Sequence, residues 1–289
     1  MQLYALDEKD KIISAESAQK QRDYRCLECA SCVRLRSGSH RKRHFYHLEP
    51  NRSCRLHQKG AVHLQLQTYF YRHLPEGDCQ LEYRMPAIGR IADVVWFSKK
   101  IVFEIQYSPI TAEEVNRRNL DYQRLGWTVV WILHERRFNH IRLSAAEHLL
   151  RYLPHYFTNM NSQGDGIIYD QFDLIYQGMR RDKMGPLAVD FTQPCPFLID
   201  QKGGLSLERV RRRAEHSPYF FAGDLSDLEL RKREDSYIQN ALQKEMAFTH
   251  NEQLRRVLQR ESVFRRLANV IFKRPYQFVF RLLLERTCR

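Results

Sequence analysis

The sequence has no apolar run long enough to cross a lipid bilayer. Its most apolar tail, residues 278–284, is short and is interrupted by Arg281. The first residues lack the basic start and apolar core that mark a secretory signal peptide. We therefore expect no membrane insertion and a cytoplasmic protein.

Acidic residues are scarce relative to basic ones. The 289 residues include 34 Asp and Glu against 47 Lys and Arg, which gives a formal net charge of +13. This balance suits a polyanionic partner, either nucleic acid or an anionic membrane surface. A chain of this length can bury a real core, and we expect it to form two or more domains.

A complete disulfide framework is also missing, because the seven cysteines are an odd number and three of them lie within residues 26–32. This clustering favours metal ligation in a reducing compartment. Cys26 and Cys29 form a Cys-x-x-Cys pair that can hold one ion from a tight turn, and a His-x-x-His pair, His44 and His47, follows. The sequence predicts a structural zinc site that staples a small segment with few apolar residues.

The fourth zinc ligand stays open. Cys26, Cys29 and His47 form the preferred set. Three residues compete for the remaining place, and their spacing does not decide among them: His44, Cys54 and Cys32. We name His44, so that the expected set is Cys26, Cys29, His44 and His47. The alternative is a cluster of buried cysteines without metal beside a basic loop.

Basic residues surround this segment, and only Glu28 and Glu49 oppose them. Aromatic residues interleave with the basic ones, a combination that suits phosphate contacts and base stacking with single-stranded nucleic acid. We expect the run Arg41, Lys42 and Arg43 to contact DNA. A solvated basic face is the alternative.

A β-hairpin is expected over residues 89–107, where two runs rich in Val, Ile, Phe and Trp flank a polar break at residues 98–100. A two-residue loop of Ser98 and Lys99 places Asp93 opposite Glu104. Side chains alternate along a strand, so Asp93, Glu104 and Gln106 then lie on one face. A three-residue loop would undo this register.

Two carboxylates opposite each other repel, and apolar neighbours make their ionised forms costly. Mg²⁺ would remove that cost, because it takes one or two carboxylates and leaves its waters free for chemistry. We therefore expect Asp93 and Glu104 to bind Mg²⁺ or Mn²⁺. The alternative is a surface hairpin whose acids are solvated.

The elements around the hairpin predict an α/β core. A helix is expected over residues 60–74, a strand over residues 81–84, a helix that Thr111 caps and that ends at Gly126, and a fully apolar strand over residues 127–133. The apolar strand is typical of one buried on both faces in a parallel arrangement. The expected order is helix, three strands, helix, strand.

Over roughly residues 1–155 the sequence resembles the competence protein CoiA-like family, whose nuclease-like domain has the PD-(D/E)xK restriction-endonuclease-like fold. The matching pieces are Cys26-x-x-Cys29, His44-Phe-Tyr-His47, His63, Arg90-Ile-Ala-Asp93-Val, Glu104-Ile-Gln106-Tyr-Ser-Pro-Ile, Arg117, Tyr122 and Trp131-Ile-Leu. Together they are specific, although each is weak alone.

The resemblance implies that Asp93 and Glu104 hold the catalytic metal ion, with Glu82 as a third acid. It places Gln106 where a lysine usually positions or activates the attacking water. Gln can orient a water, but it cannot stabilise negative charge as an ammonium does. Lys99 or Lys100 would substitute only if the loop folds back.

Three further residues of the predicted site have two possible roles each. His63 either helps to deprotonate water or is a structural, hydrogen-bonded histidine. Arg117 and Tyr122 contact either a phosphate or Gln106, or they form ordinary contacts at the rim of the core.

Three domains are expected: a zinc-knuckle-like segment at 1–59, the nuclease-like domain at 60–157, and a mainly helical, basic domain at 167–289. Residues 167–176 fit either a strand or a short helix. Helical spacing recurs over residues 225–248 and 251–272, and Pro275 precedes a last helix. The third domain either contacts DNA backbone, docks on a protein or presents a solvated face.

Two functions follow. The first is a metal-dependent nuclease that hydrolyses DNA phosphodiester bonds during natural transformation. The second is a catalytically inactive nuclease fold that binds single-stranded DNA and hands it to recombination proteins. We favour the first because Asp93 and Glu104 are both present, while Gln106 favours the second.

Overall fold

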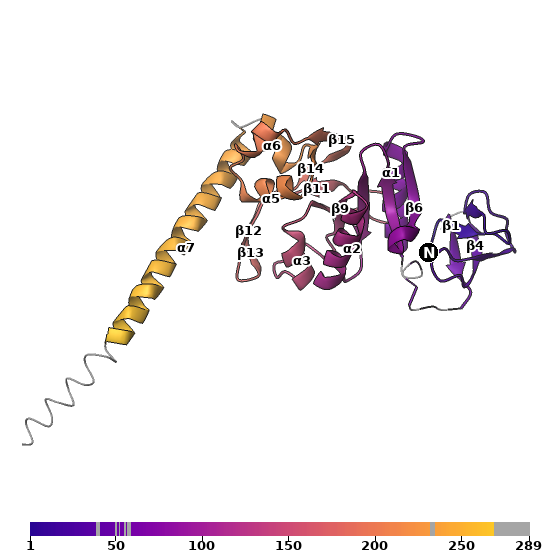
Figure 1. Ribbon diagram of the computed structural model, residues 1–289, viewed down its shortest axis with the longest axis horizontal. Helices are drawn as coiled ribbons and strands as arrows, with labels where there is room; N and C mark the ends of the chain where they lie inside the picture. The colour runs from indigo at the N-terminus through magenta and orange to yellow at the C-terminus, as the bar shows by residue number, and fades with distance from the viewer. Residues whose placement is uncertain are drawn as a thin grey trace, which may run out of the picture. The chain divides into compact units, whose positions relative to one another are not determined.

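The computed structural model describes residues 1–38, 41–49, 51, 53–54, 56, 59–231 and 235–268. Some side chains within those ranges, among them that of Arg41, lie outside the description. The chain forms two compact units, Met1–Ile238 and Gln239–Arg289. Both the zinc-knuckle-like segment and the nuclease-like core lie in the first unit, which Figure 1 shows from indigo to orange.

The N-terminal segment forms a five-stranded sheet of order β2-β1-β3-β4-β5. Its strands are β1 (Tyr4–Leu6), β2 (Ile12–Ser14), β3 (Asp23–Arg25), β4 (Cys32–Gly38) and β5 (Arg41–His47). Tyr24 and Phe45 meet edge to face with ring centroids 5.1 Å apart. Both rings are buried, so the aromatic residues at these two positions build the core of the segment.

A seven-stranded sheet forms the centre of the first unit. In spatial order its strands are β14 (Leu187–Ala188), β11 (Ile168–Asp170), β10 (His155–Thr158), β9 (Thr128–His134), β8 (Ile101–Gln106), β7 (Arg90–Trp96) and β6 (Cys79–Met85). The pairs β6–β7 and β7–β8 are antiparallel, and β8–β9 and β9–β10 are parallel. The predicted mixed α/β architecture is confirmed.

Helices cover both faces of this sheet, which explains its continuous apolar strands. On one face α1 (Ala61–His73) packs Leu66 and Phe70 against Phe103, and Figure 1 shows α1 beside β6. On the other face α2 (Ala112–Arg124) packs Val115 and Tyr122 near Trp131, together with α3 (Ala145–Leu150). The predicted order of helix, three strands, helix and strand is confirmed, with one turn of 3₁₀ helix, η2 (Pro86–Ile88), before β7.

The register of the hairpin is as predicted. Val94 pairs with Phe103, and the N–H of Lys100 donates to the carbonyl of Phe97 at 3.1 Å. This bond closes a turn with two central residues, Ser98 and Lys99. A turn of this length keeps the buried side chains of both strands on their buried faces, whereas a shift by one residue would reverse them.

The sheet continues beyond residue 157, because β11 adds to β10 and β14 adds to β11. Four more strands form two small hairpin sheets: β12 (Asp173–Tyr176) with β13 (Met179–Lys183), and β15 (Asp190–Pro196) with β16 (Tyr219–Ala222). Residues 167–176, for which the sequence left strand or helix open, therefore contain two strands, β11 and β12. The three-domain division falls partly within one compact unit, and it stays a prediction.

Helices dominate the rest of the described chain: α4 (Ile199–Lys202), α5 (Glu208–His216), α6 (Leu225–Arg231) and α7 (Ser236–Ala268). α7 is one 33-residue helix that no Gly or Pro interrupts. The expected segment 225–248 begins in α6 and ends in α7, and the described part of the expected segment 251–272 lies within α7. The final expected helix lies outside the described residues. None of the described helices is both long and apolar enough to cross a membrane.

Candidate functional site

Three acidic side chains lie in a row across three adjacent strands: Glu82 on β6, Asp93 on β7 and Glu104 on β8. The residues on either side of Glu82 and Asp93 are in register. Val94–Phe103 is the last pair between β7 and β8, and Asp93 and Glu104 are the next residues beyond it, one on each strand. All three acids are buried, so the predicted facing of Asp93 and Glu104 extends to a third carboxylate.

Asp93 has cationic partners on one oxygen and a backbone donor on the other. The Nζ of Lys59 lies 2.7 Å from Oδ1, and Nε2 of His63 lies 3.0 Å from the same atom. The N–H of Ile105 donates to Oδ2 at 2.9 Å. Burial by itself raises the pKa of Asp93, but the charges and hydrogen bonds of His63 and Lys59 outweigh burial and lower it, so Asp93 is ionised.

Glu82 holds the other side of Lys59, with its Oε1 3.2 Å from Nζ. Its Oε2 accepts from the N–H groups of Leu3 and Tyr4 at 3.0 and 3.1 Å, which ties β1 to the nuclease-like sheet. The φ of Glu82 is 48°, a left-handed conformation that costs a non-glycine residue about 1 kcal/mol or more. Strain of this kind is typical of functional sites.

Lys59 is a site residue that the sequence analysis did not find. Burial favours its neutral form, but the attraction of Asp93 and Glu82 outweighs burial and raises the pKa of Lys59. Both carboxylates therefore favour the charged ammonium. No local pattern marks Lys59, because its partners lie 23 and 34 residues away in sequence.

Glu104 is held by α2. Arg118 donates to Oε2 at 2.7 Å, and the hydroxyl of Tyr122 donates to Oε1 at 2.5 Å. Burial raises the pKa of Glu104, whereas Arg118 and Tyr122 oppose that rise. Burial and the adjacent Glu104 raise the pKa of Tyr122, which keeps its hydroxyl a donor.

The helix positions these donors through its cap and its period. The hydroxyl of Thr111 accepts from the N–H of Glu114 at 3.1 Å, as expected of the N-cap. Glu114, Arg118 and Tyr122 then recur every fourth residue and face the sheet. This stripe was a signal for Arg118 that the sequence analysis missed.

A cavity of about 410 Å³ opens beside the acidic row. Its lining includes most of the predicted catalytic residues, namely His63, Asp93, Glu104 and Gln106, together with Lys59, Arg117 and Tyr122. Glu82 is not among the lining residues, so it acts through Lys59. Lys99 does not fold back to the site, since its Nζ lies 6.0 Å from the ring centroid of Tyr219.

Gln106, Tyr122 and Arg117 all line the cavity, but they differ in burial and in hydrogen-bond partners. The amide nitrogen of Gln106 donates to the carbonyl oxygen of Ser108 at 2.6 Å. Tyr122 is fully buried and contacts Glu104, not Gln106. Arg117 pairs with Glu114, and its side chain is 64% exposed, so it can reach a ligand at the cavity mouth.

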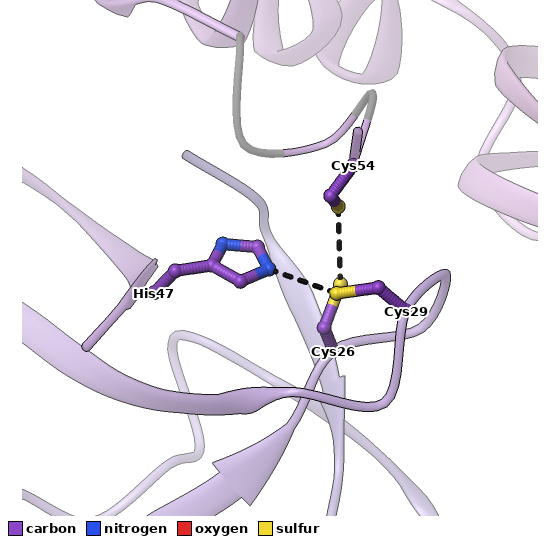
Figure 2. Close-up of side chains that lie close together, drawn as sticks. All are labelled: Cys26, Cys29, His47 and Cys54. Atoms are coloured by element: carbon purple, nitrogen blue, oxygen red, sulfur yellow. Dashed lines mark hydrogen bonds between the residues drawn. The ribbon is translucent and has the colours of Figure 1, made fainter. Parts of the chain in front are cut away.

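A second cluster of side chains lies in the N-terminal segment (Figure 2), where Cys26, Cys29, His47 and Cys54 point toward one another. Their candidate ligand atoms all lie within 4.8 Å of one another. The Sγ atoms of Cys26 and Cys54 are 3.7 Å apart, and Sγ of Cys29 is 3.3 Å from Nε2 of His47. A tetrahedral zinc with Zn–S bonds of about 2.3 Å separates its sulfur ligands by about 3.8 Å. The cluster therefore fits one zinc ion.

The predicted ligand His44 is not in this cluster, and Cys54 takes its place. Side chains alternate along β5, so His47 faces Cys29 whereas His44, three residues earlier, faces the other side. Nδ1 of His44 lies 2.8 Å from the carbonyl oxygen of Lys42. His44 lines a separate cavity of about 520 Å³.

The residues expected to contact DNA, 41–43, differ in exposure and in bonding partners. Lys42 is exposed and lines the same 520 Å³ cavity as His44. Arg43 instead donates to the carbonyl oxygens of Ala15 and Ala18, both at 2.8 Å, which fixes the loop that precedes β3. The side chain of Arg41 lies outside the described residues.

The acidic row also fits a hard divalent cation. Asp93 and Glu104 present carboxylate oxygens to one cavity, the donor type that Mg²⁺ uses with a small number of protein ligands. An ionised carboxylate has about four lone-pair sites, so both residues can accept a further partner. Among the described residues, the Cys/His cluster is the one group of three or more candidate ligands this close together.

A mixed sheet with an acid-lined cavity, together with a Cys/His cluster that could hold zinc, fits a nuclease-like protein with an N-terminal metal-binding segment. Comparison with family models agrees: the competence protein CoiA N-terminal domain matches residues 7–57, and the competence protein CoiA nuclease-like domain matches residues 55–169. Together the two matches span more than half of the chain, which belongs to the CoiA-like family. Searches of the curated proteins and of the solved structures found no match.

Proposed function

We propose that the protein hydrolyses phosphodiester bonds of DNA with a divalent cation, Mg²⁺ or Mn²⁺, held by Asp93 and Glu104. One observation carries the proposal: two buried carboxylates on neighbouring strands line the same cavity. The family membership supports a role in natural transformation and DNA recombination.

The reaction consumes one water per bond. The water oxygen forms a bond to phosphorus, the bond from phosphorus to one sugar oxygen breaks, and that oxygen leaves with a proton, so that a phosphate monoester and a hydroxyl result. The bound cation would lower the pKa of its water and neutralise charge on the phosphate. In the cavity, the carbonyl oxygen of Gln106 can orient the water, whereas His63 holds the Asp93 carboxylate.

The N-terminal cluster has a structural role in this proposal. A zinc ion on Cys26, Cys29, His47 and Cys54 would fix the segment that leads into Lys59 and α1. The exposed Lys42 would contact the backbone of single-stranded DNA. We expect the protein to act in the cytoplasm.

A non-catalytic role in holding single-stranded DNA is the second candidate. It is favoured by the pairing of both acids with protein cations, Asp93 with Lys59 and Glu104 with Arg118. A cation already supplied by the protein reduces the need for a metal ion.

Cleavage of labelled single- and double-stranded DNA with Mg²⁺ or Mn²⁺ separates the two candidates. The nuclease proposal predicts that Asp93→Ala and Glu104→Ala lower the rate by a factor on the order of 10² or more, whereas Glu113→Ala, an exposed acid on the same helix as Arg118, retains it. Equal cleavage by the wild type and both cavity variants would indicate contamination and end the proposal.

A further inference from the structure

Negative charge builds on the phosphate during hydrolysis, and a protein cation beside Asp93 would stabilise that charge in addition to a bound metal ion. Among the described lining residues, three arginines are engaged away from Asp93. Arg90 pairs with Glu114 and Asp121, and Arg118 pairs with Glu104 and Glu114. Arg117 pairs with Glu114, and its side chain is largely exposed to solvent. Lys59 and His63 both line the cavity and touch Asp93, and of the two Lys59 carries the ammonium, which lies 2.7 Å from Oδ1.

We propose that Lys59 is a catalytic residue whose ammonium stabilises the charge that develops on the phosphate beside Asp93. This inference rests on the proposed nuclease function. An ammonium has three N–H donors, and Asp93 and Glu82 account for two of them. Among the described residues the Lys59 ammonium has no third partner, so its remaining donor can turn to a ligand in the cavity that Lys59 lines.

The surroundings of Lys59 fix its ammonium in place. Its side chain is 9% exposed and bridges neighbouring strands through Asp93 on β7 and Glu82 on β6. Glu82 has no part in the cavity lining, yet it is buried and adopts a left-handed backbone conformation opposite Asp93. A rigid donor contributes more to catalysis than a mobile one, because it needs no reorganisation during the reaction.

The neutral side chain of Gln106 leaves this role open for Lys59. Gln106 lines the same cavity from β8 and is neutral, and its amide nitrogen is directed to Ser108. Lys59 comes instead from the segment that precedes α1, and it enters the cavity beside His63. The segment before α1 thus provides, through Lys59, a positive charge that Gln106 on β8 does not carry.

Relocation of the ammonium tests the proposal. We expect Lys59→Met to lower the single-turnover cleavage rate by a factor on the order of 10²–10³, with Mn²⁺ affinity unchanged or tighter because a competing cation is gone. The double variant Lys59→Met/Gln106→Lys should recover at least about tenfold of that rate, because it returns an ammonium to the same cavity. Lys99→Met, on the distant hairpin turn, is the matched control and should retain the wild-type rate.

Each outcome decides the matter. Undiminished cleavage by Lys59→Met overturns the Lys59 proposal alone. Loss of cleavage together with Mn²⁺ binding, without recovery in the double variant, assigns Lys59 a structural role and also overturns it. Absence of Asp93-dependent cleavage by the wild type overturns both this proposal and the nuclease function. If Lys59→Met does not fold, Lys59→Gln replaces it, because the amide keeps hydrogen bonds to both acids without charge.

Discussion

The hydroxyl of Tyr122 donates to Oε1 of Glu104 across 2.5 Å, and both side chains are buried between α2 and the central sheet. This bond fixes one carboxylate oxygen of the acidic row from the far side of the cavity. We infer that Tyr122 positions Glu104, while the phosphate contact named in the sequence analysis stays a prediction.

Tyr122→Phe removes that donor and leaves the ring in place. We expect the variant to lose about 1–3 kcal/mol of unfolding free energy, because a buried carboxylate loses a partner. DNA cleavage should fall more than Mn²⁺ affinity does. Chemical denaturation and cleavage assays test this against Tyr71→Phe, whose ring is 48% exposed; equal stability of both variants would contradict it.

Zinc content distinguishes the candidate ligand set with Cys54 from the predicted set with His44. Purified wild-type protein should hold about one zinc per chain, and Cys54→Ser should lose it. His44→Ala should keep its zinc, because His44 faces the other side of β5. Cys32→Ser, an exposed cysteine, is the control. Zinc that is lost in His44→Ala and kept in Cys54→Ser would restore the original ligand set.

Two neighbouring cations on β5 should have different effects on DNA binding and stability. Lys42→Ala should weaken binding of single-stranded DNA and lower the slope of log affinity against log salt by about 0.7, the value for one phosphate contact. Arg43→Ala should mainly lower stability, because two carbonyl oxygens lose their donor. Binding titrations over a salt series and thermal melts measure both effects; an unchanged salt slope in Lys42→Ala would exclude the contact.

Because of Glu114, the free energy of unfolding should fall as the pH is lowered into the acid range. Burial opposes its ionisation, but hydrogen bonds from Arg118 and Arg117 outweigh burial and lower the pKa of Glu114 to about 2. A folded pKa below the unfolded one gives stability that is present above about pH 4.3 and is lost as pH falls toward 2. Glu114→Gln should therefore be less stable than wild type at pH 7, and the gap should close by about pH 2. A gap that persists at that pH, measured by denaturant titration, would rule out this origin.

Arg213 links α5 to β11, a strand of the central sheet. Its NH1 atom lies 2.9 Å from Oδ2 of Asp170 and 2.8 Å from Oδ2 of Asp224, and all three side chains are buried. Arg213→Met leaves two buried carboxylates without this partner and should cost about 3–5 kcal/mol of unfolding free energy. Arg211→Met, exposed on the same helix, should have little effect on the denaturation midpoint. Equal midpoints for the two variants would contradict the prediction.

Local features made several parts of the fold predictable. The polar break after Phe97 set the hairpin register, since a shift by one residue would have turned every buried side chain to the wrong face. Thr111 marked the start of α2, because its hydroxyl caps a backbone N–H only three residues away. The apolar run of β9 indicated a strand covered on both faces.

The contacts that complete the two sites came only from tertiary structure. Cys54, Lys59 and Arg118 reach partners on other elements, and several spacings fit a zinc shell equally well on the linear chain. Sequence alone predicted the hairpin register and placed Asp93 and Glu104 on one face, because strand pairing and side-chain alternation are local rules; the register is confirmed, and both residues line one cavity. Packing of distant segments decided which cations meet those acids, because such charge pairs depend on distances of a few ångströms that no local pattern encodes.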